Sequence, residues 1–440
     1  MPRTSIAYRA LLRLGVLLAP VLGRSDKASA GHRGRAGAAG RLTAWARAGR
    51  DRGRPLVWFH ASSVGEGLQA ESVLLELRRL LPDAQYVYTH FSPSAEALSR
   101  RLPVDAADYL PYDLPATITP LLTELAPDLL VFAKLDLWPE LATRTEAAGA
   151  TVALVAATVA PGSGRLRWPA RALLRAGYES VAAAGAIADE DAARLARLGV
   201  PRARIRVLGD PRFDSVAAKV RAVSPEDPLL ALGGPGTLIA GSTWPADEGV
   251  LLRAFADVRK GVPVARLILV PHEPTEEHLR MVEDVAAGLG LPTPIRLSNA
   301  SAPGPLLLVD RVGVLARLYG AGELAYVGGG YGRAGLHSVL EPAAWGVPVS
   351  FGPRWRESRD AGLLLTAEAA RALPADPVLA AAQLADWWRE GLADGDARSA
   401  AGRRALAVVE SGAGAARRSA ELLAGLISSR PLRTSPSGAR

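Results

Sequence analysis

Short apolar segments alternate with amphipathic segments from Pro55 onward, and this alternation most constrains the fold. The first apolar run, at 56–59, is followed by apolar residues at helical spacing over 68–81. Strict alternation of strands and helices predicts a parallel, doubly wound α/β sheet. The strands expected in this first part lie at 56–59, 85–90, 129–133, 151–157, 181–187 and 204–209.

The pattern restarts after a segment rich in proline and glycine at 224–236. New strands are expected at 237–241, 266–271, 306–309, 324–329 and 347–352. Two Rossmann-like domains are therefore predicted, and ligands of such sheets gather at the carboxyl ends of the strands, in a cleft where the domains face each other. The expected divisions are a basic head at 1–54, an N-terminal domain at 55–224, a C-terminal domain at 225–427 and a disordered tail at 428–440.

The positive charge of the chain is concentrated in its head. The chain carries a net charge of +8, but residues 1–54 hold twelve Lys and Arg against two Asp, a net +10 that leaves −2 for the remainder. The nearly neutral body and the small aromatic content of the head argue against a nucleic-acid partner.

The head also contains an apolar run, "ALLRLGVLLAPVL" at 10–22, which is interrupted by Arg13 and Pro20. This run is shorter than the roughly 20 residues of a membrane-spanning helix. Three interpretations stay open: an anchor on the membrane surface, a disordered end, and a signal peptide with a cleavage site near 28–31. The anchor is preferred because anionic lipid attracts each nearby cation by about 1 kcal/mol.

Cysteine is absent, which excludes disulfides and thiolate metal sites and fits a reducing compartment. The six histidines include no pair at a metal-ligand spacing. We therefore expect no metal site.

Charged residues follow strands of the first domain. Glu66 lies where the strand at 56–59 passes into a helix, and Asp136 lies just beyond the strand at 129–133. A surface salt bridge with Lys134 is the alternative interpretation of Asp136. Arg212 precedes the interdomain segment and suits bidentate contact with phosphate or carboxylate.

In the second domain, the strand near 324–329 ends in Gly328, Gly329 and Gly330, and a helix is expected to open near 336–338. Glycines let backbone N–H groups approach an anion, and a helix N-terminus adds positive charge. Steric demands of a tight turn explain the glycines equally well. Glu341 is a candidate ribose contact, or a cap of its own helix.

Two further strand ends carry polar residues. Ser242 and Thr243 follow the strand at 237–241, either as ligand contacts or only as N-caps of the helix that Pro245 opens. Pro271 and His272 end the next strand, and His272 is expected on the ligand side.

Seven motifs in order give the chain a family resemblance. They are "FHASSVGE", "DLWPEL", "GDPRFD", "GSTWPADE", "VPHEPTEE", "DRVGVLARLYGAGELAYVGGGY" and "GLHSVLEPAAWGVPVSFGP". Their order and spacing over roughly residues 40 to 370 resemble the 3-deoxy-D-manno-octulosonic acid (Kdo) transferases, which have the GT-B fold.

The resemblance implies a reaction and a place for it. Kdo would pass from CMP-Kdo to a lipid A precursor, lipid IVA, with inversion at the anomeric carbon. No metal or cofactor beyond the donor would take part, and the protein would work on the anionic cytoplasmic face of the inner membrane.

The resemblance also implies roles for individual residues. Glu66 matches the general base that an inverting transfer needs to deprotonate the acceptor hydroxyl. Asp136 and Arg212 match groups that stabilise the transition state. The nucleotide contacts match Pro271, His272, Val312, Gly313, Val314, Ser338, Val339, Leu340 and Glu341.

The chain departs from the common family pattern at four of these places. Many members have Glu at Asp136, Lys at Arg212, an Arg-His pair at 272–273 and Glu at Val314. We therefore interpret the chain as a divergent member. The alternatives are a GT-B transferase with another nucleotide sugar and a non-catalytic, membrane-associated nucleotide-binding module. No residue pattern indicates how many Kdo units are transferred or which acyl chains the acceptor carries. The sequence likewise gives no sign of the oligomeric state or of whether the head spans the membrane or lies on it.

Overall fold

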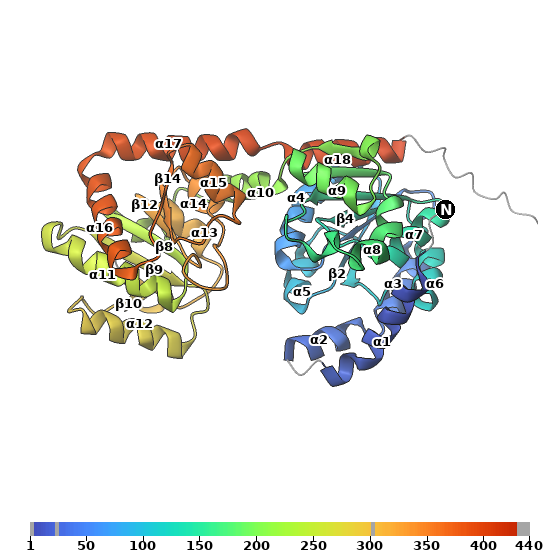
Figure 1. Cartoon of the computed structure of the whole chain (residues 1–440), viewed down its shortest axis with the longest axis horizontal. Helices are drawn as coiled ribbons and strands as arrows, with labels where there is room; N and C mark the ends of the chain where they lie inside the picture. The colour runs from blue at the N-terminus through green and yellow to red at the C-terminus, as the bar shows by residue number, and fades with distance from the viewer. Residues whose placement is uncertain (1–3, 23–25, 301–303, 429–440) are drawn as a thin grey trace, which may run out of the picture. The chain divides into compact units, whose positions relative to one another are not determined.

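A computed structural model describes residues 4–22, 26–300 and 304–428 (Figure 1). The chain divides into two compact units, Met1–Ser215 together with the segment that begins at Ala413, and Val216–Gly412. The predicted boundaries at 224/225 and 427/428 differ from this division. Except for Ser428, the predicted disordered tail lies outside the described residues.

The described part of the first unit holds a seven-stranded parallel sheet in the order β3-β2-β1-β4-β5-β6-β7. Its strands are β1 (Leu56–His60), β2 (Gln85–His90), β3 (Ala106–Tyr109), β4 (Leu129–Ala133), β5 (Thr151–Ala157), β6 (Ala183–Ala186) and β7 (Ile205–Val207). The strand order reverses between β1 and β4, so this is the switch point where such sheets bind ligands.

Helices cover both faces of this sheet (Figure 1). The helices of the first unit are α1 (Ile6–Leu22), α2 (Asp26–Arg35), α3 (Ala38–Gly49), α4 (Val64–Leu80), α5 (Glu96–Arg101), α6 (Pro115–Leu125), α7 (Pro139–Ala147), α8 (Ala170–Glu179), α9 (Asp189–Leu198) and α18 (Ala415–Ser428), and α10 (Pro211–Arg221) runs across the boundary between the units. α18 packs against α4 and buries Ala416, Ala420 and Leu423 in the core of the first unit. The alternation pattern did not predict this return of the chain.

The head is not one separate segment. Leu42 and Ala46 of α3 are buried in the first core, and Arg50 bonds to Gln85 of β2. Residues from Ala38 onward are therefore part of the first domain. Among the described residues, no helix combines the length and apolarity needed to cross a membrane.

The second unit contains another seven-stranded parallel sheet within its described residues, in the order β10-β11-β9-β8-β12-β13-β14. Its strands are β8 (Thr237–Thr243), β9 (Arg266–Pro271), β10 (Ile295–Arg296), β11 (Leu306–Leu308), β12 (Leu324–Val327), β13 (Val349–Phe351) and β14 (Ala370–Ala372). The switch point here lies between β8 and β12.

The helices of the second unit are α11 (Pro245–Gly261), α12 (Glu276–Gly288), α13 (Leu315–Leu318), α14 (Leu340–Ala344), α15 (Arg359–Thr366), α16 (Pro377–Ala393) and α17 (Gly395–Gly412). Phe255 of α11 stacks on Trp388 of α16 at 5.6 Å between ring centroids, and both are fully buried. The predicted α/β class with two doubly wound parallel sheets is confirmed. The cleft between the domains stays a prediction.

His90, at the end of β2, is an unusual buried group. Its ring is 1% exposed and packs 4.2 Å from the ring of Tyr109, and within the described residues neither ring nitrogen has a hydrogen-bond partner. Burial lowers the pKa of His90 to about 4. Between pH 6.5 and 4 the unfolded chain therefore binds a proton that the folded chain does not. The free energy of unfolding therefore decreases as the pH is lowered through this window.

We predict that His90→Phe removes this part of the acid sensitivity. Wild type should lose more free energy of unfolding than the variant between pH 6.5 and 4, and the difference between the two proteins should be constant above pH 7.5. Urea unfolding at a series of pH values measures this. If the free energies of unfolding of the two proteins decrease equally between pH 6.5 and 4, the assignment to His90 is wrong.

Candidate active site

Glu66 lies in the first turn of α4, directly after the carboxyl end of β1. Its Oε2 accepts hydrogen bonds from the backbone N–H of Ser63 at 3.1 Å and from the Ser63 hydroxyl at 3.2 Å. The carboxylate thus helps to cap its own helix, a structural role that the S-x-x-E spacing signals and that the motif comparison overlooked. No hydrogen bond or ion pair to Oε1 occurs within the described part of the chain, so one oxygen of a fixed carboxylate is uncommitted.

Asp136 follows the neighbouring strand β4 and is held by three side chains. His60 Nε2 lies 3.1 Å from its Oδ2, Arg165 lies 4.0 Å from its Oδ1, and Trp138 is a further hydrogen-bond donor. Burial raises the pKa of Asp136, but the bond and charge of His60 and the charge of Arg165 outweigh it, so this pKa lies below its ordinary value. Asp136 is therefore an oriented, ionised carboxylate at the switch point.

His60 is the site residue that the sequence reasoning missed. It is the last residue of β1, is fully buried, and bonds to Thr89 through Nδ1 at 3.0 Å. The same Nε2 that contacts Asp136 also lies 3.2 Å from Trp138 Nε1. A histidine that ends an otherwise apolar strand was the available signal, because buried polar groups need partners.

Arg212 lies in the first turn of α10. Its Nε lies 2.7 Å from Asp210 Oδ2 and its Nη2 lies 2.6 Å from the same oxygen, and the Asp210 side chain is 3% exposed. The nearby Asp214 accepts the backbone N–H groups of Gly414 and Ala416, where α18 begins. Arg212 is thus a half-exposed cation fixed by a buried acid.

The three glycines after β12 are required by close packing. A Cβ on Gly328 would lie 2.3 Å from the backbone oxygen of Ser242, and one on Gly330 would lie 2.8 Å from the Cα of Gly352. Gly329 has φ 92°, and its N–H donates to Asp247 at 2.9 Å. The steric explanation therefore accounts for these glycines, and their contact with an anion stays a prediction.

The helix expected to open near 336–338 begins later. α14 starts at Leu340 and has five residues, because residues 331–339 form a loop without regular structure. Ser338 is exposed, whereas Val339 and Leu340 are buried, so a ligand could meet only the backbone of these two residues. Glu341 makes an ion pair with Lys219 at 3.8 Å, and burial raises its pKa.

The N-cap roles predicted for Ser242 and Thr243 are wrong. β8 runs through Thr243, so Trp244 is the N-cap of α11, and its N–H donates to Asp247 at 3.0 Å. The Thr243 hydroxyl is buried and donates to Glu248 at 2.8 Å. Ser242 adopts φ 53°, a left-handed conformation that is uncommon outside glycine.

An aromatic stack stands beside the glycine loop. The rings of His272 and His337 lie 4.3 Å apart, and Trp244 packs 5.0 Å from His272 and donates through Nε1 to His337 Nε2 at 3.1 Å. Burial, and then the neighbouring His272, lower the pKa of His337 to about 4. His337 is therefore neutral at pH 7, and His272 is exposed at the end of β9.

The remaining predicted nucleotide contacts lie at the start of α13. Val312 is 74% exposed, Gly313 has φ 85°, and Val314 is buried as the N-cap of the helix. Pro271 is buried at the end of β9. The structure thus places these residues, His272 and the glycine loop after the carboxyl ends of strands of one sheet.

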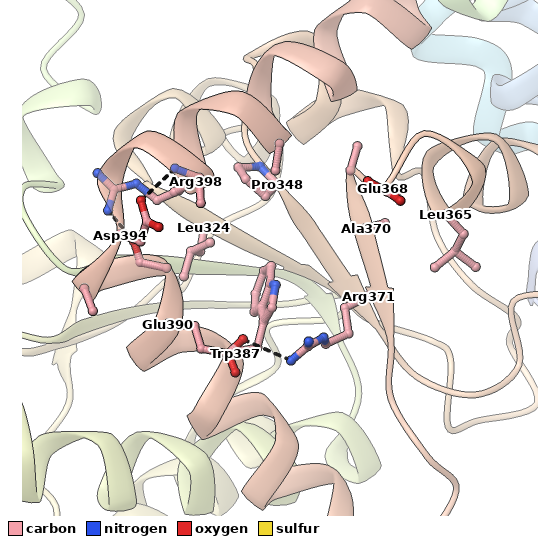
Figure 2. Close-up of a pocket in the computed structure, with 15 residues that line it drawn as sticks. Leu324, Pro348, Leu365, Glu368, Ala370, Arg371, Trp387, Glu390, Asp394 and Arg398 are labelled. Atoms are coloured by element: carbon pink, nitrogen blue, oxygen red, sulfur yellow. Dashed lines mark hydrogen bonds and ion pairs between the residues drawn. The ribbon is translucent and has the colours of Figure 1, made fainter.

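A pocket of about 610 Å³ lies elsewhere, at the amino ends of β12, β13 and β14 (Figure 2). Leu324, Pro348 and Trp387 line it. Its arginines are paired with acids, Arg371 with Glu390 at 3.4 Å and Arg398 with Glu323 at 2.7 Å. Because this edge is opposite the carboxyl ends, the pocket is separate from the candidate active site.

Within the described ranges, no group of three or more His, Cys, Asp or Glu side chains is arranged to hold a metal ion.

Comparisons of the sequence with known proteins agree on one family. A family model described as "3-Deoxy-D-manno-octulosonic-acid transferase (kdotransferase)" matches residues 35–215. The chain is 31% identical over 414 residues to the 3-deoxy-D-manno-octulosonic acid transferase of Bordetella pertussis, an alignment that covers 88% of this chain and 93% of that protein. It is 30% identical to the transferase of the same name from Chlamydia muridarum, over 68% of this chain and 70% of that protein.

A solved structure has the same fold. The UDP-GlcNAc 2-epimerase from Neisseria meningitidis bound to UDP-GlcNAc superposes with a TM-score of 0.60 at 11% identity, over 86% of this chain and all of that chain. At this identity the similarity shows the fold alone: two Rossmann-like domains of the GT-B type.

We predict that Gly328→Ala destabilises the protein by about 1–3 kcal/mol, because its Cβ would overlap backbone atoms that cannot move independently. Gly332→Ala, in the same loop, is the matched control, since its Cβ would meet no atom closer than 3.8 Å. Urea unfolding of both variants measures the difference. Equal free energies of unfolding for the two variants would show that the loop is not held as described.

Proposed function

This chain belongs to the 3-deoxy-D-manno-octulosonic acid transferase family, and from that premise we propose that it transfers Kdo from CMP-Kdo to lipid IVA, a lipid A precursor. The proposal includes inversion at the anomeric carbon, CMP-Kdo as donor substrate with no metal or other cofactor, and work at the cytoplasmic face of the inner membrane. Its main support is the 31% identity that extends over 93% of a relative of that name.

Glu66 is the proposed general base, and its geometry is the observation that carries the mechanism. The capping bonds to Ser63 fix one oxygen, and the other oxygen is left to accept the proton of an acceptor hydroxyl. As that proton leaves, the hydroxyl oxygen attacks the anomeric carbon and the bond to the CMP phosphate breaks. General-base assistance of this kind contributes about 10²- to 10⁴-fold.

Asp136 and Arg212 are proposed to stabilise charge that develops during transfer. The ionised, oriented carboxylate of Asp136 suits a positively charged sugar ring, and the guanidinium of Arg212 suits a phosphate. Groups held by buried partners do not need to reorganise during the reaction. His60 holds Asp136 in this way, and Asp210 holds Arg212.

The second domain is proposed to bind the CMP part of the donor. Proposed contacts are His272 with its stacked partner His337, and the backbone from Val312 to Val314. Rings at this position can pack against a nucleotide base or ribose. Glu341, whose pKa is raised by burial, is the proposed partner of the ribose hydroxyls.

α1 is proposed to lie on the anionic membrane surface. One side of this helix exposes a set of large apolar side chains. They are Ile6 at 84%, Leu11 at 57%, Leu14 at 54%, Leu17 at 75% and Leu18 at 39% exposure. An exposed apolar stripe flanked by arginines is typical of helices that lie in the membrane interface.

Glu66→Gln is predicted to lower kcat by about 10²- to 10⁴-fold while leaving CMP binding and stability unchanged. Glutamine can still accept the bonds from Ser63, so the capping role is kept and only the base is lost. Steady-state kinetics, calorimetric CMP titration and thermal melting separate the three quantities. Loss of CMP binding together with activity would contradict the assignment to the acceptor hydroxyl, and transfer from a UDP-sugar instead of CMP-Kdo would favour another GT-B activity.

The membrane proposal is tested with Leu14→Glu/Leu17→Glu. Each leucine contributes about 1.5–3 kcal/mol when buried in lipid, so binding to vesicles containing phosphatidylglycerol should weaken by more than about tenfold. Val378→Glu/Leu379→Glu on α16 is the control, because these side chains are also exposed, at 70% and 57%. If the α1 variant sediments with vesicles as wild type does, α1 is not the anchor.

A further inference from the structure

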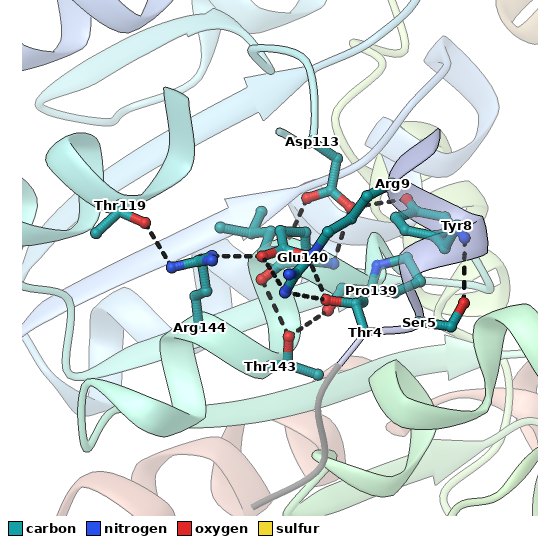
Figure 3. A network of polar contacts seen from close by, with 11 residues as sticks. Thr4, Ser5, Tyr8, Arg9, Asp113, Thr119, Pro139, Glu140, Thr143 and Arg144 are labelled. Carbon is teal, nitrogen blue, oxygen red and sulfur yellow. Dashed lines mark hydrogen bonds and ion pairs between the residues drawn. The ribbon is translucent and has the colours of Figure 1, made fainter. Parts of the chain in front are cut away.

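The first turns of α1 are tied to a fully buried carboxylate. Arg9 donates through Nε to Glu140 Oε2 at 2.9 Å and through Nη2 to Glu140 Oε1 at 3.1 Å (Figure 3). The Glu140 side chain is 0% exposed, and Thr4 and Arg144 also donate to it. Burial raises the pKa of Glu140, but the bonds from Arg9, Thr4 and Arg144 outweigh it and leave this pKa below its ordinary value.

A second carboxylate fixes the same place. Asp113 is 1% exposed and accepts the backbone N–H groups of Glu140 at 2.9 Å and Leu141 at 2.7 Å, which are in the first turn of α7. The hydroxyl of Tyr8 donates to Asp113 at 2.7 Å (Figure 3). α1 is therefore joined by two side chains to the first turn of α7, which begins three residues after Asp136.

α2 is also connected to the loop that carries Asp136, through Phe91 and Trp138. The guanidinium of Arg35 lies 3.6 Å from the ring centroid of Phe91, and Phe91 stacks on Trp138 at 5.1 Å. The Nε1 of Trp138 lies 3.2 Å from Nε2 of His60, which holds Asp136. A continuous series of contacts thus joins α2 to the candidate catalytic carboxylate.

We propose that α1 and α2 are part of the catalytic apparatus, with Arg9 and Arg35 as positioning residues for the loop that carries Asp136. This inference rests on the proposed function. The loop from 134 to 138 has a strained start, since Lys134 adopts φ 62°, so outside contacts are needed to keep one conformation. Arg9 bonds to buried Glu140, whereas Leu14 and Leu17 of the same helix are exposed, so loop positioning and membrane contact are separable by mutation.

The kinetic test compares Arg9→Ala and Arg35→Ala with Arg47→Ala in detergent micelles, with CMP-Kdo and lipid IVA as substrates. Arg47 is the matched control. It lies on the surface of α3, its side chain is 69% exposed, and it forms an ion pair with Glu124 of α6. Misplacement of a reacting group by about 1 Å costs up to about 10²-fold, so kcat should fall about 10- to 100-fold in the two test variants. The KM for CMP-Kdo should not change, and Arg47→Ala should behave as wild type.

Arg9→Lys should have a higher kcat than Arg9→Ala, because lysine keeps a positive charge beside Glu140 but cannot form the bidentate hydrogen bond. If Arg9→Ala does not fold, Tyr8→Phe and Arg9→Lys decide the matter, since each removes only part of the contacts. Wild-type kcat in the folded test variants, or a loss that appears only in KM, would overturn the proposal.

Hydrogen exchange of the backbone amides at 134–143 gives a readout that needs no activity. Exchange there should be faster in Arg9→Ala and Arg35→Ala than in wild type and Arg47→Ala. Unchanged exchange would overturn the positioning role even if activity falls. If wild type transfers no Kdo at all, the proposed function fails, and the exchange result still tests whether these arginines hold the loop.

Discussion

The parallel pairing of β1 with β4 is the constraint on which the candidate active site depends. In its register His60 pairs with Phe132, so the two strands end side by side and the chain leaves them into α4 and into the loop that carries Asp136. His60 can bond to Asp136 only because this register brings the last residue of β1 to the end of β4. A slip of one residue would turn the imidazole to the other face of the sheet. Glu66 and Asp136 are thus placed by backbone pairing, and their exact orientation is then set by side chains.

Buried carboxylates fix the loops after the strands in both domains. Asp247 accepts the N–H groups of Trp244 and Gly329 and so joins the ends of β8 and β12. Asp113 accepts two N–H groups at the start of α7 and so fixes the end of the loop after β4. A buried acid is costly unless it is fully bonded, and these acids are bonded to backbone groups that would otherwise be unsatisfied. The loops at both switch points are therefore rigid before any ligand arrives.

The sequence predicted those parts of the molecule that follow from periodicity. Long apolar strands such as β2 and β5 were predicted within a residue or two, because alternation with helices is a strong signal. Strands β3, β10 and β14 were not predicted, since they are short and lie at sheet edges, where few of their residues are buried. The return of α18 to the first domain depends on tertiary contacts that no local pattern encodes. Among the site residues, the positions of Glu66 and Asp136 at strand ends were predictable, whereas the bond from His60 and the capping by Trp244 depend on geometry across strands.

The central claim is that this fold moves Kdo from a cytidine nucleotide to a lipid. Mass spectrometry of lipid IVA after incubation with CMP-Kdo and the full chain tests it most directly. The account predicts that the mass of the lipid rises by one or more Kdo residues, in step with the release of CMP. A lipid of unchanged mass, from a folded protein that binds CMP, would contradict it.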